Sequence, residues 1–175
     1  PAPVNGQMWY NSTTKVMKGF TSNPAGSWSS GGDLNTARRA MAAGGTLTSS
    51  VVFGGSTAPF PSASKDETET YNGTAFTEVA DMNTGRQSLT GTGASSTSAL
   101  AIGGFDPTNP NYHTAIVESW NGSAWTEVAD LGTARYSLAS AGTVTNALAF
   151  GGSTSPTSTK TETESWNGSS WTEVA

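Results

Sequence analysis

The sequence predicts an all-β fold that contains three copies of one unit. An arginine recurs 48 and then 49 residues apart, at Arg38, Arg86 and Arg135. A glycine doublet recurs with nearly the same spacing, at residues 54–55, 103–104 and 151–152. An aromatic residue followed by Asn-Gly then closes each unit, at residues 71–73, 120–122 and 166–168. A fixed period of this size is typical of repeat architectures.

Each unit contains four candidate strands. The first follows the arginine, in residues 40–43, 88–91 and 137–140. The second precedes the glycine doublet, in residues 50–53, 99–102 and 147–150. The third and fourth flank Asn-Gly, which favours a two-residue turn, so we expect Trp120 to pair with Ser123 and Glu118 with Trp125. Four short antiparallel strands per unit of roughly 50 residues are typical of a β-propeller blade.

The repeats predict one continuous propeller-like domain of about three and a half blades. Residues 33–80, 81–129 and 130–175 are the full blades. Residues 1–32 are interpreted as an N-terminal hairpin or half blade, in which residues 27–29 align with residues 124–126. Propellers usually close with four to eight blades, so we expect a longer chain or an association of copies.

Several residues recur because the scaffold needs them. Glutamates recur in step with the three arginines, at Glu69, Glu118 and Glu164. We expect each arginine to form a partly buried ion pair with its glutamate, which satisfies both charges within the scaffold. Tryptophans recur around the Asn-Gly turns, at Trp120, Trp125, Trp166 and Trp171, and Phe76 replaces one of them in the first unit. Small residues in the first strands suit close packing near a propeller axis.

Composition excludes several classes of function. The net charge is −5 and no basic patch is visible, so we expect no nucleic-acid partner. No apolar run approaches the roughly 18 residues of a membrane span, so we expect no membrane insertion. The chain has no cysteine and one histidine, which excludes disulfides, zinc thiolate sites and metal sites built from several histidines. We therefore expect no metal and no cofactor.

No residue pattern indicates catalysis. His113 is the single histidine, and no nucleophile or orienting acid accompanies it in the sequence. Paired carboxylates could support glycoside hydrolysis. However, the glutamates recur at the same positions of every unit, as structural residues do. The sequence therefore predicts a protein that is not an enzyme and has no catalytic residue.

The connection after each glycine doublet differs between the units. Loops on a rigid scaffold are where binding residues gather. Aromatic and polar side chains in the first two connections are therefore the binding candidates: Phe60, Phe105, Asp106, Tyr112 and His113. They suit stacking on a glycan or a partner surface, and equally suit contact with a neighbouring subunit.

The pattern of arginine, apolar strand, Gly-Gly, variable loop and closing tryptophan resembles the Kelch repeat over residues 33–175. Residues 6–19 resemble a short module of tail-fibre and other structural proteins of tailed bacteriophages. The nearly identical segments 120–129 and 166–175 also resemble Kelch-like proteins of marine phages, including cyanophages. The resemblance carries over no functional residue.

This resemblance implies a structural or adhesive protein of a virion or extracellular assembly. We expect it to associate with itself and to contact a host-surface glycan or other virion proteins. The alternatives are a subunit of an extracellular bacterial filament or matrix and, less well supported, an intracellular protein-binding Kelch module.

Overall fold

The computed structural model describes residues 8–11, 16–19, 30–57 and 64–174. The chain divides into two compact units, Pro1–Ser30 and Gly31–Ala175. In the first unit, β1 (Met8–Asn11) pairs antiparallel with β2 (Val16–Gly19), which confirms the expected hairpin. The predicted alignment of residues 27–29 with the later repeats lies outside the described residues.

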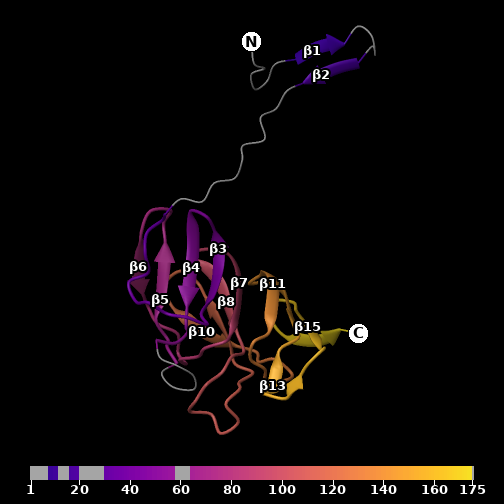
Figure 1. Ribbon diagram of the computed structural model, residues 1–175. Coiled ribbons are helices and arrows are strands. Elements are labelled where there is room, and N and C mark those ends of the chain that lie inside the picture. The colour runs from indigo at the N-terminus through magenta and orange to yellow at the C-terminus, as the bar shows by residue number, and fades with distance from the viewer. Residues whose placement is uncertain (1–7, 12–15, 20–29, 58–63, 175) are drawn as a thin grey trace. The chain divides into compact units, whose positions relative to one another are not determined.

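The second unit contains three four-stranded antiparallel sheets (Figure 1). The first sheet comprises β3 (Ala42–Thr46), β4 (Ser49–Phe53), β5 (Thr68–Tyr71) and β6 (Phe76–Val79). The second comprises β7 (Thr90–Ser95), β8 (Ser98–Ile102), β9 (Val117–Trp120) and β10 (Trp125–Val128). The third comprises β11 (Ala139–Thr143), β12 (Asn146–Phe150), β15 (Thr163–Trp166) and β16 (Trp171–Val174). Between β12 and β15 in the sequence, β13 (Ser153–Ser155) and β14 (Ser158–Thr159) form a separate short hairpin.

The described part of the chain is therefore all-β and contains no helix, as the sequence predicts. Within residues 8–11, 16–19, 30–57 and 64–174, no helical segment has the length and apolar character that a membrane crossing requires. Each sheet falls inside one of the three repeats. Consecutive strands lie side by side, so each repeat folds largely by local pairing.

The predicted two-residue Asn-Gly turn is wrong, because the connection between the last two strands has four residues. Trp120 pairs with Trp125, and Glu118 pairs with Glu127. The Asn121 side-chain oxygen accepts hydrogen bonds from the backbone N–H groups of residues 123 and 124, at 2.9 and 3.0 Å. This local side-chain bonding lengthens the turn. Glu118, Trp120 and Trp125 still share one face of the sheet.

The first strand of each sheet begins two residues later than predicted. The residues at the predicted starts, Ala40, Ser88 and Ser137, have φ values of 52°, 51° and 52°. A left-handed residue interrupts an extended strand, so each chain segment bends here before β3, β7 and β11 begin. Alanine and serine are not markers of positive φ, which explains why the sequence pattern failed at this position.

The first strands of the three sheets lie next to one another, with β7 between β3 and β11 (Figure 1). Glycines permit this close approach. A Cβ atom added to Gly44 would lie 3.1 Å from the backbone nitrogen of Gly93, and one added to Gly91 would lie 2.6 Å from the Phe53 ring. The expected crowding of small residues at this position is therefore present.

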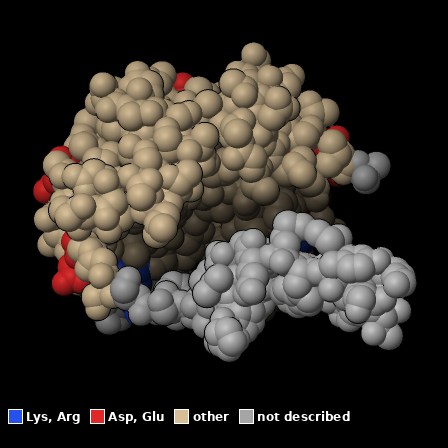
Figure 2. All heavy atoms as spheres, turned by 90° about the horizontal axis from the view of Figure 1, so that it is seen from above, with Lys and Arg blue, Asp and Glu red and all other residues tan. Residues whose placement is uncertain are grey.

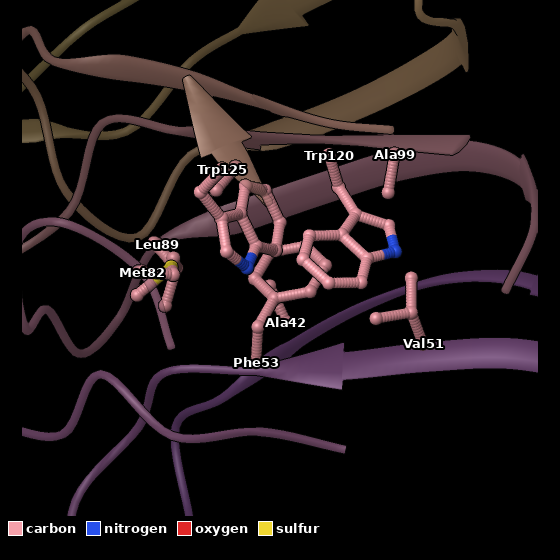
Figure 3. Packing of buried hydrophobic residues seen from close by; sticks show 9 residues of the cluster. Ala42, Val51, Phe53, Met82, Leu89, Ala99, Trp120 and Trp125 are labelled. Atoms are coloured by element: carbon pink, nitrogen blue, oxygen red, sulfur yellow. The ribbon is translucent and has the colours of Figure 1, made fainter. Parts of the chain in front are cut away.

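One apolar core joins the first and second sheets (Figure 3). Phe53 of β4 meets Trp125 edge to face, with ring centroids 4.8 Å apart, and Trp120 lies beside Trp125 at 5.4 Å. Val51 and Ala99 extend the same contact. Because aromatic side chains bury large areas, this packing fixes the position of the second sheet against the first.

A second core repeats this arrangement between the second and third sheets. Leu100 and Ile102 of β8 pack against the cluster that contains Trp166, with Trp171 at its margin. One polar detail differs between the two cores. Trp125 Nε1 donates to the Thr68 hydroxyl at 3.0 Å, whereas the corresponding Trp171 Nε1 is buried and has no partner among the described residues. Val117 occupies the position in the second repeat that Thr68 occupies in the first.

Charged side chains are sparse on the face shown in Figure 2. In the part of this face that grey atoms do not cover, most of the surface is tan, and the red aspartate and glutamate atoms lie toward its margins.

Candidate functional site

A buried ion pair joins the recurring arginine and glutamate in every repeat. The distances from Nη2 to Oε1 are 2.6 Å for Arg38–Glu69, 2.8 Å for Arg86–Glu118 and 2.8 Å for Arg135–Glu164. All these side chains are at most 5% exposed. The pairing that the repeat predicts is thus present in all three copies.

The second repeat shows how the fold satisfies this pair. Arg86 Nη1 donates to the carbonyl oxygens of Gly103 and Ile116, at 2.9 and 2.6 Å. The second carboxylate oxygen of Glu118 accepts from the backbone and side-chain N–H groups of Asn83, at 2.8 and 2.7 Å. Burial lowers the pKa of Arg86, and the Glu118 carboxylate opposes that shift. Because both carboxylate oxygens already have partners, the arrangement favours a scaffold role over proton transfer.

The first repeat has the same hydrogen-bond network, but its arginine and glutamate are slightly less buried than those of the second repeat. Burial raises the pKa of Glu69, but hydrogen bonds from the Asn35 backbone N–H and from Arg38 outweigh it. The net result is a Glu69 pKa below its ordinary value. Glu69 therefore stays ionised in the fold, beside a cation that is itself inaccessible to solvent.

The connections after the second and third glycine doublets both line a pocket of about 390 Å³. The second repeat contributes Phe105, Asn111, Tyr112 and His113 to the lining. The third repeat contributes Tyr136, Thr154, Ser155 and Pro156. The pocket thus lies between two adjacent repeats.

Three aromatic rings shape this pocket. Phe105 and Tyr112 stack with their ring planes 5° apart and their centroids separated by 5.6 Å. Tyr136 meets Phe105 nearly at a right angle, at 82° and 6.0 Å. Phe105 is only 4% exposed, whereas Tyr112 is 55% exposed. The buried Phe105 ring therefore supports an accessible tyrosine ring.

Backbone hydrogen bonds hold Tyr112 in place. Its carbonyl oxygen accepts from the Asp106 N–H at 3.0 Å, and its own N–H donates to the Asn109 carbonyl at 2.9 Å. Tyr112 has a φ of 62°. A bulky residue in this left-handed region is uncommon and strained, and such strain gathers at binding sites.

The predicted binding residues divide into three groups. The structure brings Phe105, Tyr112 and His113 together at the pocket. Asp106 does not line the pocket; it is 7% exposed, and its Oδ1 accepts from the Thr108 N–H and hydroxyl, at 2.8 and 2.7 Å. Asp106 thus stabilises the turn of the loop. Phe60 lies outside the described residues.

Sequence reasoning missed Tyr136. This residue follows the recurring Arg135, and its backbone pairs with Ser153 directly after the glycine doublet of the third repeat. Gln87 pairs with Phe105 in the same way in the second repeat. The residue directly after the recurring arginine differs between the repeats. Its side chain lies beside the variable connection, and this variation was the signal in the sequence.

The pocket combines ring surfaces with uncharged polar groups. Its described lining contains hydroxyls, one side-chain amide and the imidazole of His113, but no carboxylate, lysine or arginine. Across the described ranges no cluster of three or more His, Asp or Glu side chains could hold a metal ion. The arrangement is suited to an uncharged ring-shaped ligand that stacks on Tyr112 and exchanges hydrogen bonds with the rim.

Comparison with known proteins supports the fold alone. No protein-family model matches the chain, and no curated protein matches it. Among solved structures, one described as "Structure of YjhT" is similar, with a TM-score of 0.64 and 14% sequence identity. The similarity covers 96% of this chain and 51% of that chain, so this chain spans about half the length of the solved structure.

Proposed function

We propose that the protein is a non-catalytic structural and adhesive protein whose sheets are Kelch-like propeller blades. Its place is a phage virion or another extracellular assembly, and its pocket around Phe105 and Tyr112 binds an uncharged sugar ring of a host-surface glycan. The observation that carries this proposal is the stacked pair of aromatic rings in an uncharged pocket between two repeats.

The blade interpretation is supported by the way the sheets repeat. Three four-stranded antiparallel sheets follow one another, each with its first strand next to the first strand of its neighbour. Radial repetition of such sheets is the principle of a β-propeller.

The glycan interpretation is supported by the chemistry of the pocket. Sugar rings present an apolar face of C–H groups and a rim of hydroxyls. Tyr112 offers an exposed ring for the first, and Asn111, His113 and Ser155 offer hydrogen-bonding groups for the second. Among the described lining residues there is no carboxylate, lysine or arginine that would select an acidic or basic ligand.

The absence of catalysis is supported by the state of the carboxylates. The glutamate of each recurring ion pair is occupied by an arginine and by backbone N–H groups within the scaffold. The glutamates opposite them on the last strands, Glu78, Glu127 and Glu173, are exposed at equivalent positions of every repeat. A catalytic pair would break this regularity at one place.

The alternative is a subunit of an extracellular filament or matrix that binds no receptor. The apolar face of the third sheet favours it, because Leu148 and Phe150 are 42% and 39% exposed. Self-association through such a face is compatible with either function.

Glycan-array binding followed by calorimetry of the selected sugar tests the proposal. Tyr112→Ala and Tyr136→Ala should each weaken binding by roughly tenfold or more, because each removes a ring from the pocket. Leu47→Ala is the control, since Leu47 is 88% exposed and does not line the pocket. Binding that is absent in the wild type, or unchanged in both tyrosine variants, would contradict the glycan interpretation.

A further inference from the structure

The two faces of each four-stranded sheet differ in chemistry. In the second sheet, Leu100 and Ile102 of β8 point to one face. We call this the aliphatic face in every sheet, after these two residues, although the first and third sheets have Phe53 and Phe150 at the position of Ile102. Ala99 of the same strand shares the opposite face with Trp120 and Trp125, and we call this the aromatic face. Alternation along the strands keeps the two sets apart.

Within the chain, an aliphatic face always meets the aromatic face of the next sheet. Val51 and Phe53 of the first sheet pack against the aromatic face of the second. Leu100 and Ile102 of the second sheet pack in the same way against the aromatic face of the third, which includes Trp166. All four aliphatic-face residues are 0% exposed.

The third sheet has the same aliphatic face, which the described part of the chain leaves partly exposed. Leu148 and Phe150 occupy the positions of Leu100 and Ile102, yet they are 42% and 39% exposed. The strand β12 shows this directly, because its residues alternate between exposed and buried along its whole length. Two large apolar side chains that are buried in the other repeats therefore remain open in this one.

The backbone beside this face also has one N–H group without a backbone acceptor among the described residues. Gly55 N–H donates to the carbonyl oxygen of Arg86 in the next repeat, and Gly104 N–H donates to that of Arg135, both at 2.8 Å. Gly152 is the third member of this series. Its N–H finds no such backbone acceptor within the described ranges. A further repeat-like surface would supply one.

The first sheet presents the complementary surface at the other end of the series. Met41, Ser50, Tyr71 and Phe76 form its aromatic face and are only partly buried. The equivalent residues of the second sheet are at most 6% exposed: Leu89, Ala99, Trp120 and Trp125. The first sheet thus carries the kind of face that covers an aliphatic face elsewhere in this chain.

We propose that a second copy of this chain covers the open face of the third sheet with the aromatic face of its first sheet. Leu148 and Phe150 then contact Tyr71 and Phe76 of the second copy. The Gly152 N–H donates to the Arg38 carbonyl of the second copy, as Gly104 does to Arg135 within one chain.

The occupant is a second copy because the internal interfaces of this chain already use the same pair of faces twice. The contact is heterologous, and it closes a ring or grows into a filament according to the rotation between copies. It does not depend on what the pocket at Tyr112 binds.

Sedimentation equilibrium of the 17.9 kDa chain tests the contact. We expect the wild type to associate, and the double variant Leu148→Glu/Phe150→Glu to weaken association by about 30-fold or more, since buried interface anchors carry effects of this size. Leu47→Glu is the control because Leu47 is exposed and lies outside both faces. Circular dichroism should show that all variants keep the wild-type fold.

Mixing two variants identifies the faces involved. Phe76→Glu damages only the aromatic face of the first sheet, and the double variant damages only the aliphatic face of the third. Each should fail to associate alone, whereas an equal mixture should form a complex of two chains through the remaining intact pair of faces. A wild type that stays monomeric, a double variant that associates normally, or a mixture that does not associate would overturn the proposal.

Discussion

The recurring ion pairs and the connection after the second glycine doublet show two different uses of one repeat. The arginine and glutamate of each repeat adopt the same buried geometry three times, within 0.2 Å in their N–O distance. The connections diverge. The second forms a loop with Tyr112 in a strained conformation, whereas the third forms the plain hairpin of β13 and β14.

This difference separates the part of each repeat that forms the common scaffold from the part that differs between the repeats. The ion pair joins the glycine doublet to the third strand of its own sheet, so its position is fixed by backbone carbonyls on both sides. The connection leaves the sheet directly after that fixed point. Its sequence is therefore free to vary without moving the strands, and a binding pocket can form there.

The largest expected effect comes from breaking the enclosed ion pair. Glu118→Gln should lower the free energy of unfolding by about 3–5 kcal/mol, because it leaves the Arg86 charge buried without a counterion. Urea denaturation measures the loss. Glu127→Gln is the matched control: Glu127 lies opposite Glu118 across the hairpin but is exposed, so its substitution should change stability by less than about 0.5 kcal/mol. Similar losses in both variants would contradict the scaffold role.

A smaller effect should follow from removing one buried hydrogen bond. Thr68→Val keeps the shape of the side chain and reproduces the arrangement at Val117, so it leaves Trp125 Nε1 without its acceptor. The cost should be about 1–3 kcal/mol in thermal or urea unfolding.

Thr163 holds the same repeat position in the third sheet, where no described tryptophan N–H donates to its hydroxyl, so Thr163→Val is the control. Its effect should be near zero in the monomer. Equal losses of stability at both positions would show that the hydrogen bond from Trp125 Nε1 to Thr68 does not contribute to stability.

The decrease of the free energy of unfolding at acidic pH should depend on Glu69. Its pKa in the fold lies below the ordinary value near 4.5, so the unfolded chain takes up its proton first as the pH falls. The stabilisation is complete above that value and is lost as the pH decreases through the lower, folded pKa. Glu69→Gln should therefore flatten the fall of unfolding free energy below about pH 4.5. An unchanged slope in this variant would contradict the assignment.

The smallest effect concerns the strained loop residue. Tyr112→Gly should relieve the left-handed strain and leave stability equal or higher by up to about 1 kcal/mol, while removing the exposed ring of the pocket. Calorimetric melting measures the change in stability, and sugar binding measures the loss of the exposed ring. Tyr112→Ala separates the two, because it removes the ring without relieving the strain. A marked loss of stability in the glycine variant would show that the ring supports the fold.

Much of the scaffold followed from the sequence because repetition amplifies weak signals. The second strands and their glycine doublets were predicted within one residue, since an apolar run ends at Gly-Gly three times. The starts of the first strands were missed, because alanine and serine give no sign of the positive φ values at Ala40, Ser88 and Ser137. These residues are joined by hydrogen bonds between repeats, from the Ser88 N–H to the Ala40 carbonyl and from the Ser137 N–H to the Ser88 carbonyl. The length of the Asn-Gly turn depended on side-chain hydrogen bonds that the sequence does not display.

Some of the residues that line the pocket were already named as binding candidates, for a different reason. Phe105, Tyr112 and His113 stood out because they interrupt the repeat within one loop. Tyr136 belongs to another repeat, and only the pairing of its backbone with Ser153 brings its ring to Phe105. Asp106 was a binding candidate, but its hydrogen bonds to Thr108 place it inside the turn of the loop. Contacts between repeats cannot be read from the period alone.

The most direct test is an NMR titration of the ¹⁵N-labelled protein with a panel of uncharged mono- and oligosaccharides. Binding at the pocket should shift the amide signals of residues 105–113, Tyr136 and 153–156, and leave the indole N–H signals of the buried Trp120 and Trp166 unchanged. That result would show that the ligand binds at the connections that differ between the repeats and not at the scaffold that recurs in all three. Shifts confined to the scaffold, or no shift with any sugar in the panel, would contradict the proposed glycan-binding function.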